Sequence, residues 1–86
     1  MALSGHHGRT LQALFAHPVS HNVEWHDVVS LLEHVGTVEE EHDGRFHVTV
    51  GSQTQTFDRP RHHRHELDEQ QVLDVRHMLS AAGITP

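Results

Sequence analysis

The side chains best suited to chemistry are arginines and histidines gathered in one short segment, residues 59–65. This basic segment holds Arg59, Arg61, His62, His63, Arg64 and His65. A guanidinium can hold a phosphate with two parallel hydrogen bonds, so a dense row of Arg beside His suits an RNA or DNA backbone. The alternative is an exposed loop whose charges offset neighbouring acids such as Glu66, Asp68 and Glu69.

The histidines raise the alternative of a metal site. Imidazole is a good ligand for borderline ions such as zinc. Two groups of histidines could supply it. These are His62, His63 and His65 in the basic segment, and His6, His7 or His42 elsewhere. No carboxylate or second histidine pair accompanies the segment at a recognised ligand spacing, so we expect neither a physiological metal site nor a cofactor.

His47 is the candidate for catalysis. The strand pattern described below places it in the middle of a central strand, on the polar face and opposite Glu39. An exposed imidazole can act as general acid or base when a ribose 2′-hydroxyl attacks the adjacent phosphate. Arg45 lies on the same face and could hold that phosphate. The alternative is a surface residue that serves only cross-strand pairing.

Two hairpins position these side chains. Residues 37–41 and 45–50 flank a turn at His42-Asp43-Gly44. A two-residue turn would set the apolar residues of the second strand, Phe46, Val48 and Val50, opposite polar and acidic residues of the first. A three-residue loop with Gly44 at positive φ instead pairs Val38 with Val48. The longer loop is therefore the better interpretation. It gives one apolar and one polar face.

The second hairpin turns at Gly51-Ser52, a pair suited to a tight turn. It sets Phe46 opposite Phe57 and completes a three-stranded antiparallel meander. The outward face of the meander then carries five side chains: Arg45, His47, Thr49, Thr54 and Thr56.

Helices account for the rest of the chain. Leu11, Leu14 and Phe15 have helical spacing and predict a short helix over residues 9–17. A second helix, capped by Asn22 or Ser20, continues to Val35 and buries Trp25 in the core.

The C-terminal helix has the clearest local signals. Asp68 and Gln71 form a capping-box pair at its start, and Gly83 suits its C-terminal cap. The order helix, helix, three strands, helix predicts an α+β domain of two layers, with the helices on one face of the sheet.

Length and composition set further bounds. The chain has 86 residues, which predicts a flexible terminus over residues 1–8 and a single domain over residues 9–86. There is no Cys. The formal net charge of −6 argues against non-specific binding of nucleic acid through overall charge. Any polyanion must therefore be bound by local charge. No 18-residue apolar run or signal peptide is present, so we expect a cytoplasmic protein that does not contact the membrane.

Several short motifs, taken in order, resemble the HicA-like family of toxins. They are residues 17–25 (HPVSHNVEW), 31–36 (LLEHVG), 43–45 (DGR), 57–60 (FDRP), 75–79 (VRHML) and 82–84 (AGI). The resemblance covers residues 14–84 and is strongest to a longer branch with an Arg-Pro-His element after the last strand. It implies a double-stranded-RNA-binding-domain-like (dsRBD-like) fold, RNA as a partner, and an mRNA endoribonuclease neutralised by a HicB-type antitoxin.

One departure from the family bears on catalysis. The better-understood branch has Gly-Ser-His at the hairpin, and that His is catalytic, whereas this chain has Gly44-Arg45-Phe46. His47, one residue further on, is a stand-in and not a matching position. We therefore expect an RNA-binding HicA-like protein, with metal-independent endoribonuclease chemistry that uses His47 together with Arg45 or Arg59. The alternative is a non-catalytic RNA- or protein-interaction module that kept the fold.

Overall fold

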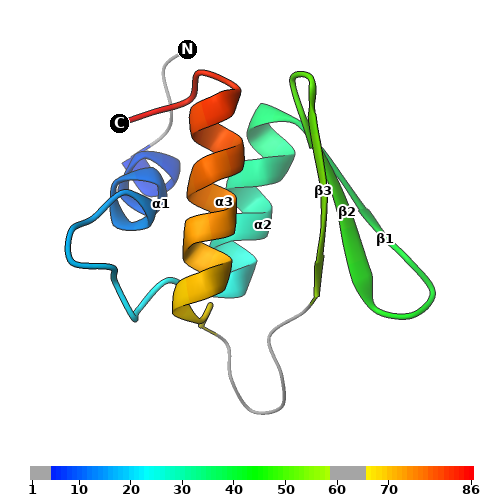
Figure 1. Cartoon of the computed structure of the whole chain (residues 1–86), viewed down its shortest axis with the longest axis horizontal. Coiled ribbons are helices and arrows are strands. Elements are labelled where there is room, and N and C mark those ends of the chain that lie inside the picture. Colours follow the sequence, from blue (N-terminus) through cyan, green and yellow to red (C-terminus); the bar gives the residue numbers. More distant parts are fainter. Residues whose placement is uncertain (1–4, 59–65) are drawn as a thin grey trace.

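Three helices and an antiparallel sheet make up the computed structural model, which describes residues 5–58 and 66–86 (Figure 1). The elements in order are α1 (Gly5–Leu14), α2 (Trp25–Val35), β1 (Thr37–Glu40), β2 (Arg45–Val50), β3 (Gln53–Asp58) and α3 (Glu69–Ala81). The sheet order is β1-β2-β3. The predicted α+β class and element order are confirmed.

The register of both hairpins is as predicted. Val38 pairs with Val48, and Phe46 pairs with Phe57. The first turn is a three-residue loop: the amide of Glu41 donates to the carbonyl of Arg45 at 2.7 Å, and Gly44 has φ +85°. This register matters for the site because it decides which side chains of β2 face solvent.

The core lies between the sheet and two helices. Figure 1 shows α2 and α3 over one face of the sheet, with α1 packed against them on the side away from the strands. The inward side chains of β2 and β3 are buried: Phe46, Val48, Val50 and Phe57. Trp25 is 9% exposed and packs edge-on against Phe46, with the ring centroids 5.2 Å apart. Its predicted core role is confirmed.

Helix α1 differs from the sequence prediction at both ends. It begins at Gly5, four residues before the start predicted at residue 9, and residues 1–4 lie outside the described part. A tertiary contact accompanies the early start, since His7 Nε2 lies 2.9 Å from Ser30 Oγ of α2. At the other end, Arg76 of α3 donates to the carbonyls of Leu14 and Ala16 at 2.7 and 3.0 Å. Neither contact is visible in a hydrophobic pattern.

Helix α2 begins later than its predicted caps imply. Its N-cap residue is Glu24, whose side chain makes no capping hydrogen bond. Ser20 instead accepts the amide of Asn22 at 3.2 Å in the connector. The prediction of a cap at Asn22 or Ser20 is therefore wrong. The Glu24 carboxylate at the start of α2 is therefore not used for capping.

Helix α3 has the predicted caps. Asp68 accepts the amide of Gln71 at 2.8 Å, and the Gln71 side chain accepts the amide of Asp68 at 3.0 Å. At the other end Gly83 has φ +81°, and the amide of Ile84 donates to the carbonyl of Leu79 at 2.8 Å. This is a Schellman motif. Local sequence signals therefore define both ends of the helix.

In the described ranges, none of the three helices combines the length and the apolar character needed to cross a bilayer.

Candidate functional site

The open face of the sheet is the first candidate site. The side chains of β2 alternate between the core and solvent, and the five predicted outward residues are half-buried or exposed: Arg45, His47, Thr49, Thr54 and Thr56. No helix covers this face in the described part of the chain (Figure 1). A flat polar surface of three strands is therefore open to a partner.

His47 lies at the centre of this open face. The register sets it beside Glu39 of β1 and Thr56 of β3. Its Nδ1 lies 3.4 Å from the Thr56 hydroxyl, a distance long for a hydrogen bond, and the side chain is only partly exposed. The imidazole thus has a neighbour that can fix one ring nitrogen, which leaves Nε2 as the atom to meet a substrate.

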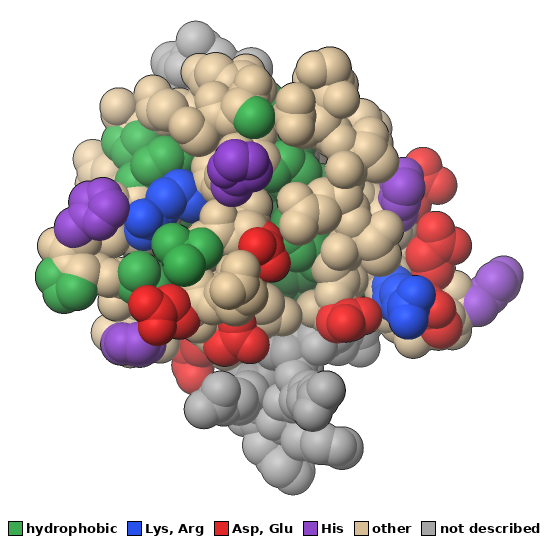
Figure 2. Space-filling view, in the orientation of Figure 1, with side chains coloured by type: hydrophobic (Ala, Val, Ile, Leu, Met, Phe, Trp, Pro, Cys, Tyr) green, Lys and Arg blue, Asp and Glu red, His purple; other side chains and the backbone are tan. Residues whose placement is uncertain are grey.

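Arg45 lies among carboxylates. Its Nε is 3.6 Å from Asp43 Oδ2 and 3.5 Å from Asp58 Oδ1. All three side chains are well exposed, and such surface pairs contribute little to stability. Figure 2 shows the consequence at the sheet edge on the right of the view, where one blue side chain lies among several red ones. The described part of the open face is therefore acidic around its one arginine.

The basic segment lies outside the described residues, so the structure does not place Arg59, Arg61, His62, His63, Arg64 or His65. The two residues that border it are well held. The Gln71 side chain of α3 donates to the carbonyl of Asp58 at 3.1 Å, and Glu66 forms a bridge with Glu24. The described residues on either side of it therefore lie at the end of β3 and beside the start of α2.

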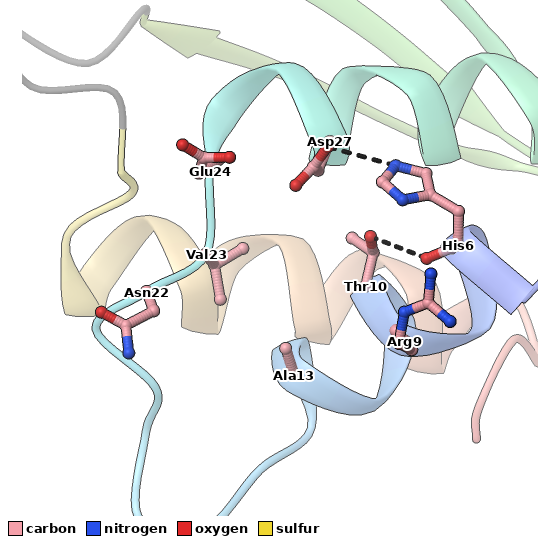
Figure 3. A pocket seen from close by; sticks show the side chains of 8 residues that line it. All are labelled: His6, Arg9, Thr10, Ala13, Asn22, Val23, Glu24 and Asp27. Atoms are coloured by element: carbon pink, nitrogen blue, oxygen red, sulfur yellow. Dashed lines mark hydrogen bonds and ion pairs between the residues drawn. The ribbon is translucent and has the colours of Figure 1, made fainter.

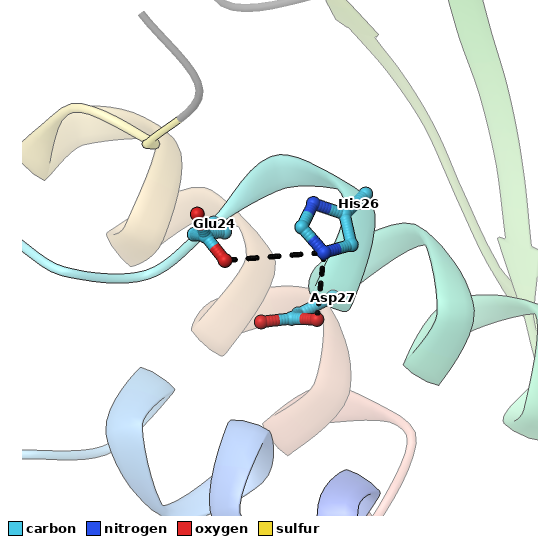
Figure 4. Close-up of side chains that lie close together, drawn as sticks. All are labelled: Glu24, His26 and Asp27. Carbon is cyan, nitrogen blue, oxygen red and sulfur yellow. Dashed lines mark ion pairs between the residues drawn. The ribbon is translucent and has the colours of Figure 1, made fainter.

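A second group of titratable side chains lies where α1 meets the start of α2. Glu24, His26 and Asp27 offer one donor atom each, and these atoms lie within 4.8 Å of one another (Figure 4). His6 of α1 points at Asp27, and both residues line one pocket (Figure 3). This group was not predicted from the sequence, where His6 was a candidate ligand only together with other histidines. The spacing Glu-x-His-Asp at a helix start is the signal that could have found the local part.

Further histidines lie along the same helix pair. The ring of His7 lies 4.9 Å from the ring of His34, centroid to centroid, and 5.7 Å from that of His6. The interface between α1 and α2 is therefore rich in imidazole, although no sequence pattern predicted it.

Comparison with protein-family models, with curated proteins and with solved structures found no match to this chain. Membership of the HicA-like family stays a prediction.

Proposed function

We propose that this chain is an RNA-binding protein of HicA-like type that contacts RNA through the open face of the sheet and the adjoining basic segment. The observation that carries the proposal is the place of His47, at the centre of the only sheet in the described residues and on its uncovered face. Three Arg of the basic segment, Arg59, Arg61 and Arg64, follow directly on from β3. The partner expected from the resemblance is a HicB-type antitoxin.

The proposed reaction is cleavage of RNA by its own 2′-hydroxyl. His47 accepts the proton of the 2′-hydroxyl as the oxygen attacks the neighbouring phosphorus. The bond from phosphorus to the 5′-oxygen breaks, and a protonated group or water supplies the proton to that leaving oxygen. The products are a 2′,3′-cyclic phosphate and a 5′-hydroxyl. The scheme needs no metal ion because the imidazole supplies the proton transfer.

Phosphate binding is assigned to Arg45 or Arg59. Arg45 is two residues from His47 on the same strand and therefore faces the same side. Its ion pairs with Asp43 and Asp58 are exposed at 3.6 and 3.5 Å, so exchanging them for a phosphate costs little. A bidentate contact with phosphate is stronger than either pair.

The carboxylates around Arg45 favour a second candidate, a non-catalytic module that binds a protein. Glu39, Glu41 and Asp43 of the first hairpin add to the charge of Asp58, which pairs with Arg45 from β3. Such a surface attracts a cationic segment of a partner and repels a nucleic-acid backbone. In a protein-binding module, the basic segment contacts a partner or keeps the protein soluble, and His47 is a surface residue without a catalytic role.

Cleavage of labelled RNA by the purified chain separates the two candidates. The RNA-cleaving protein should lose ~10²–10⁴-fold in rate with His47→Ala, because that is the usual contribution of general acid/base catalysis. His42→Ala, an exposed histidine in the neighbouring turn, is the matched control and should leave the rate unchanged. Expression of the parent alone should also arrest growth. A parent that cleaves no RNA above a mock-purified control, and that does not slow growth, leaves the binding module.

A further inference from the structure

Three donor atoms converge at the start of α2. His26 Nε2 lies 3.2 Å from Asp27 Oδ1 and 3.9 Å from Glu24 Oε2, and Figure 4 shows both carboxylates turned toward that one nitrogen. The His26 Nε2 atom carries at most one proton, so it can donate a good hydrogen bond to only one of the two carboxylates. A cation between the three atoms satisfies all of them.

A residue of a different element contacts this group. His6 Nε2 of α1 lies 3.1 Å from the same Oδ1 of Asp27 (Figure 3). Two imidazole nitrogens thus approach one carboxylate oxygen from two helices. For a tetrahedral zinc ion with bonds of about 2.0–2.2 Å, neighbouring donors lie roughly 3.4 Å apart. The two separations from His26 Nε2, 3.2 and 3.9 Å, are near that spacing. His6 lies outside the group of donors that are within 4.8 Å of one another, so it contacts the Asp27 carboxylate as an outer partner of the site.

The two acids are not explained by helix capping. Carboxylates in the first turn of a helix usually accept backbone amides, yet Glu24 stands at the N-cap and makes no such side-chain bond. Asp27 is a quarter exposed, and its Oδ1 faces the two imidazoles. The helix dipole favours carboxylates at this end of α2, but it does not account for the approach of both of them to one nitrogen of His26.

We propose that Glu24, His26 and Asp27 bind a borderline divalent metal ion, with Zn²⁺ as the best fit, and that His6 orients the Asp27 carboxylate through its contact with Oδ1. Nitrogen and carboxylate oxygen are a donor set that zinc takes in proteins. The ion lies at the start of α2, and the contact of His6 with Asp27 connects it indirectly to α1, so its role is to stabilise the packing of α1 on α2. The site is independent of RNA binding.

The test uses the full-length chain and two probes, Zn²⁺ and Co²⁺. Trp25 is the only tryptophan and lies between Glu24 and His26 in the chain, so Co²⁺ at this site should quench its fluorescence. Calorimetry should give one Zn²⁺ per chain, and thermal unfolding should shift to higher temperature with Zn²⁺ because the ion binds only the folded site.

Variants distinguish this site from the histidines of the basic segment. His26→Gln with Asp27→Asn should weaken Zn²⁺ binding by at least about tenfold, the effect of losing even an outer partner of a metal ligand, and should abolish quenching. His6→Gln should reduce the thermal shift. His62→Gln, His63→Gln and His65→Gln together should keep the quenching, and so should the control pair His21→Gln with His77→Gln. Circular dichroism without metal checks that each variant is folded.

The proposal is overturned if the parent shows no Zn²⁺-dependent thermal shift. It is also overturned if His26→Gln with Asp27→Asn keeps the parent's affinity and quenching, or if binding disappears when only the basic-segment histidines are replaced.

Discussion

The Nδ1 atom of His47 lies 3.4 Å from the hydroxyl of Thr56 on the neighbouring strand. The two residues are directly paired in the β2–β3 register, so the contact follows from the backbone and not from a chance rotamer. Either the hydroxyl donates to an unprotonated Nδ1, or a protonated Nδ1 donates to the hydroxyl oxygen. Thr56 thereby biases which nitrogen of His47 is presented to solvent.

The first prediction concerns this orientation. Thr56→Val removes the hydroxyl but keeps the branched shape, so the tautomer population of His47 should change while the fold is retained. Nitrogen chemical shifts of the imidazole report that population. Thr54→Val is the control, because Thr54 is exposed on the same face and pairs with Thr49 instead. Identical His47 spectra in both variants and the parent would show that the contact does not orient the ring.

The first turn provides the second prediction. Gly44 has φ +85°, and no atom lies within 4 Å of the place where a Cβ would stand. Gly44→Ala should therefore destabilise the protein through backbone strain alone, by about 1 kcal/mol or more. Gly8→Ala in α1 also meets no neighbouring atom, but its backbone is helical, so it should stabilise by roughly 0.5–1 kcal/mol. Urea unfolding measures both. Equal effects of the two substitutions would contradict the loop geometry.

Gly36 gives a prediction of a different kind. A Cβ at this position would lie 2.1 Å from the carbonyl oxygen of Thr49, so the junction of α2 and β1 passes directly against the backbone of β2. Because a backbone cannot move aside cheaply, Gly36→Ala should cost about 3 kcal/mol, the upper part of the usual range for overpacking. The same unfolding assay applies. A cost no larger than that of Gly44→Ala would mean that this contact is looser than the structure indicates.

The capping box of α3 gives the fourth prediction. Asp68→Ala removes the acceptor for the amide of Gln71 and should destabilise the protein by about 1 kcal/mol. Gln70→Ala is the control. It removes only an exposed bond at 2.9 Å to Asp74, a contact one helical turn away that contributes roughly 0.2–0.5 kcal/mol. Chemical denaturation of both variants tests the difference. The box is unimportant if Asp68→Ala costs no more than Gln70→Ala.

Local signals explain how much of this fold could be predicted. Gly44 and Gly83 have the positive φ expected of them, and the pairing of Phe46 with Phe57 follows from alternation and turn length. The start of α1 could not be predicted in the same way, because it lies beside Ser30, a residue 23 positions away from His7 in the chain.

Local sequence signals also predict some parts of the candidate sites and not others. The outward direction of His47 is a consequence of strand period and was predictable. The approach of His6 to Asp27 depends on how α1 packs against α2, and the apolar period of each helix does not tell which polar residues of the two will meet. The acids around Arg45 were visible as residues, but their convergence on one guanidinium required the turn geometry.

Salt-dependent RNA binding tests the central claim most directly. Replacing Arg59, Arg61 and Arg64 together by Gln should weaken binding of single-stranded RNA at low salt. Each lost phosphate contact should also reduce the slope of log affinity against log salt by roughly 0.7. Arg9→Gln, on the helix far from the sheet, is the control and should leave the slope unchanged (Figure 1). If affinity and slope are the same in the triple variant as in the parent, the basic segment does not contact RNA and the proposed function is wrong.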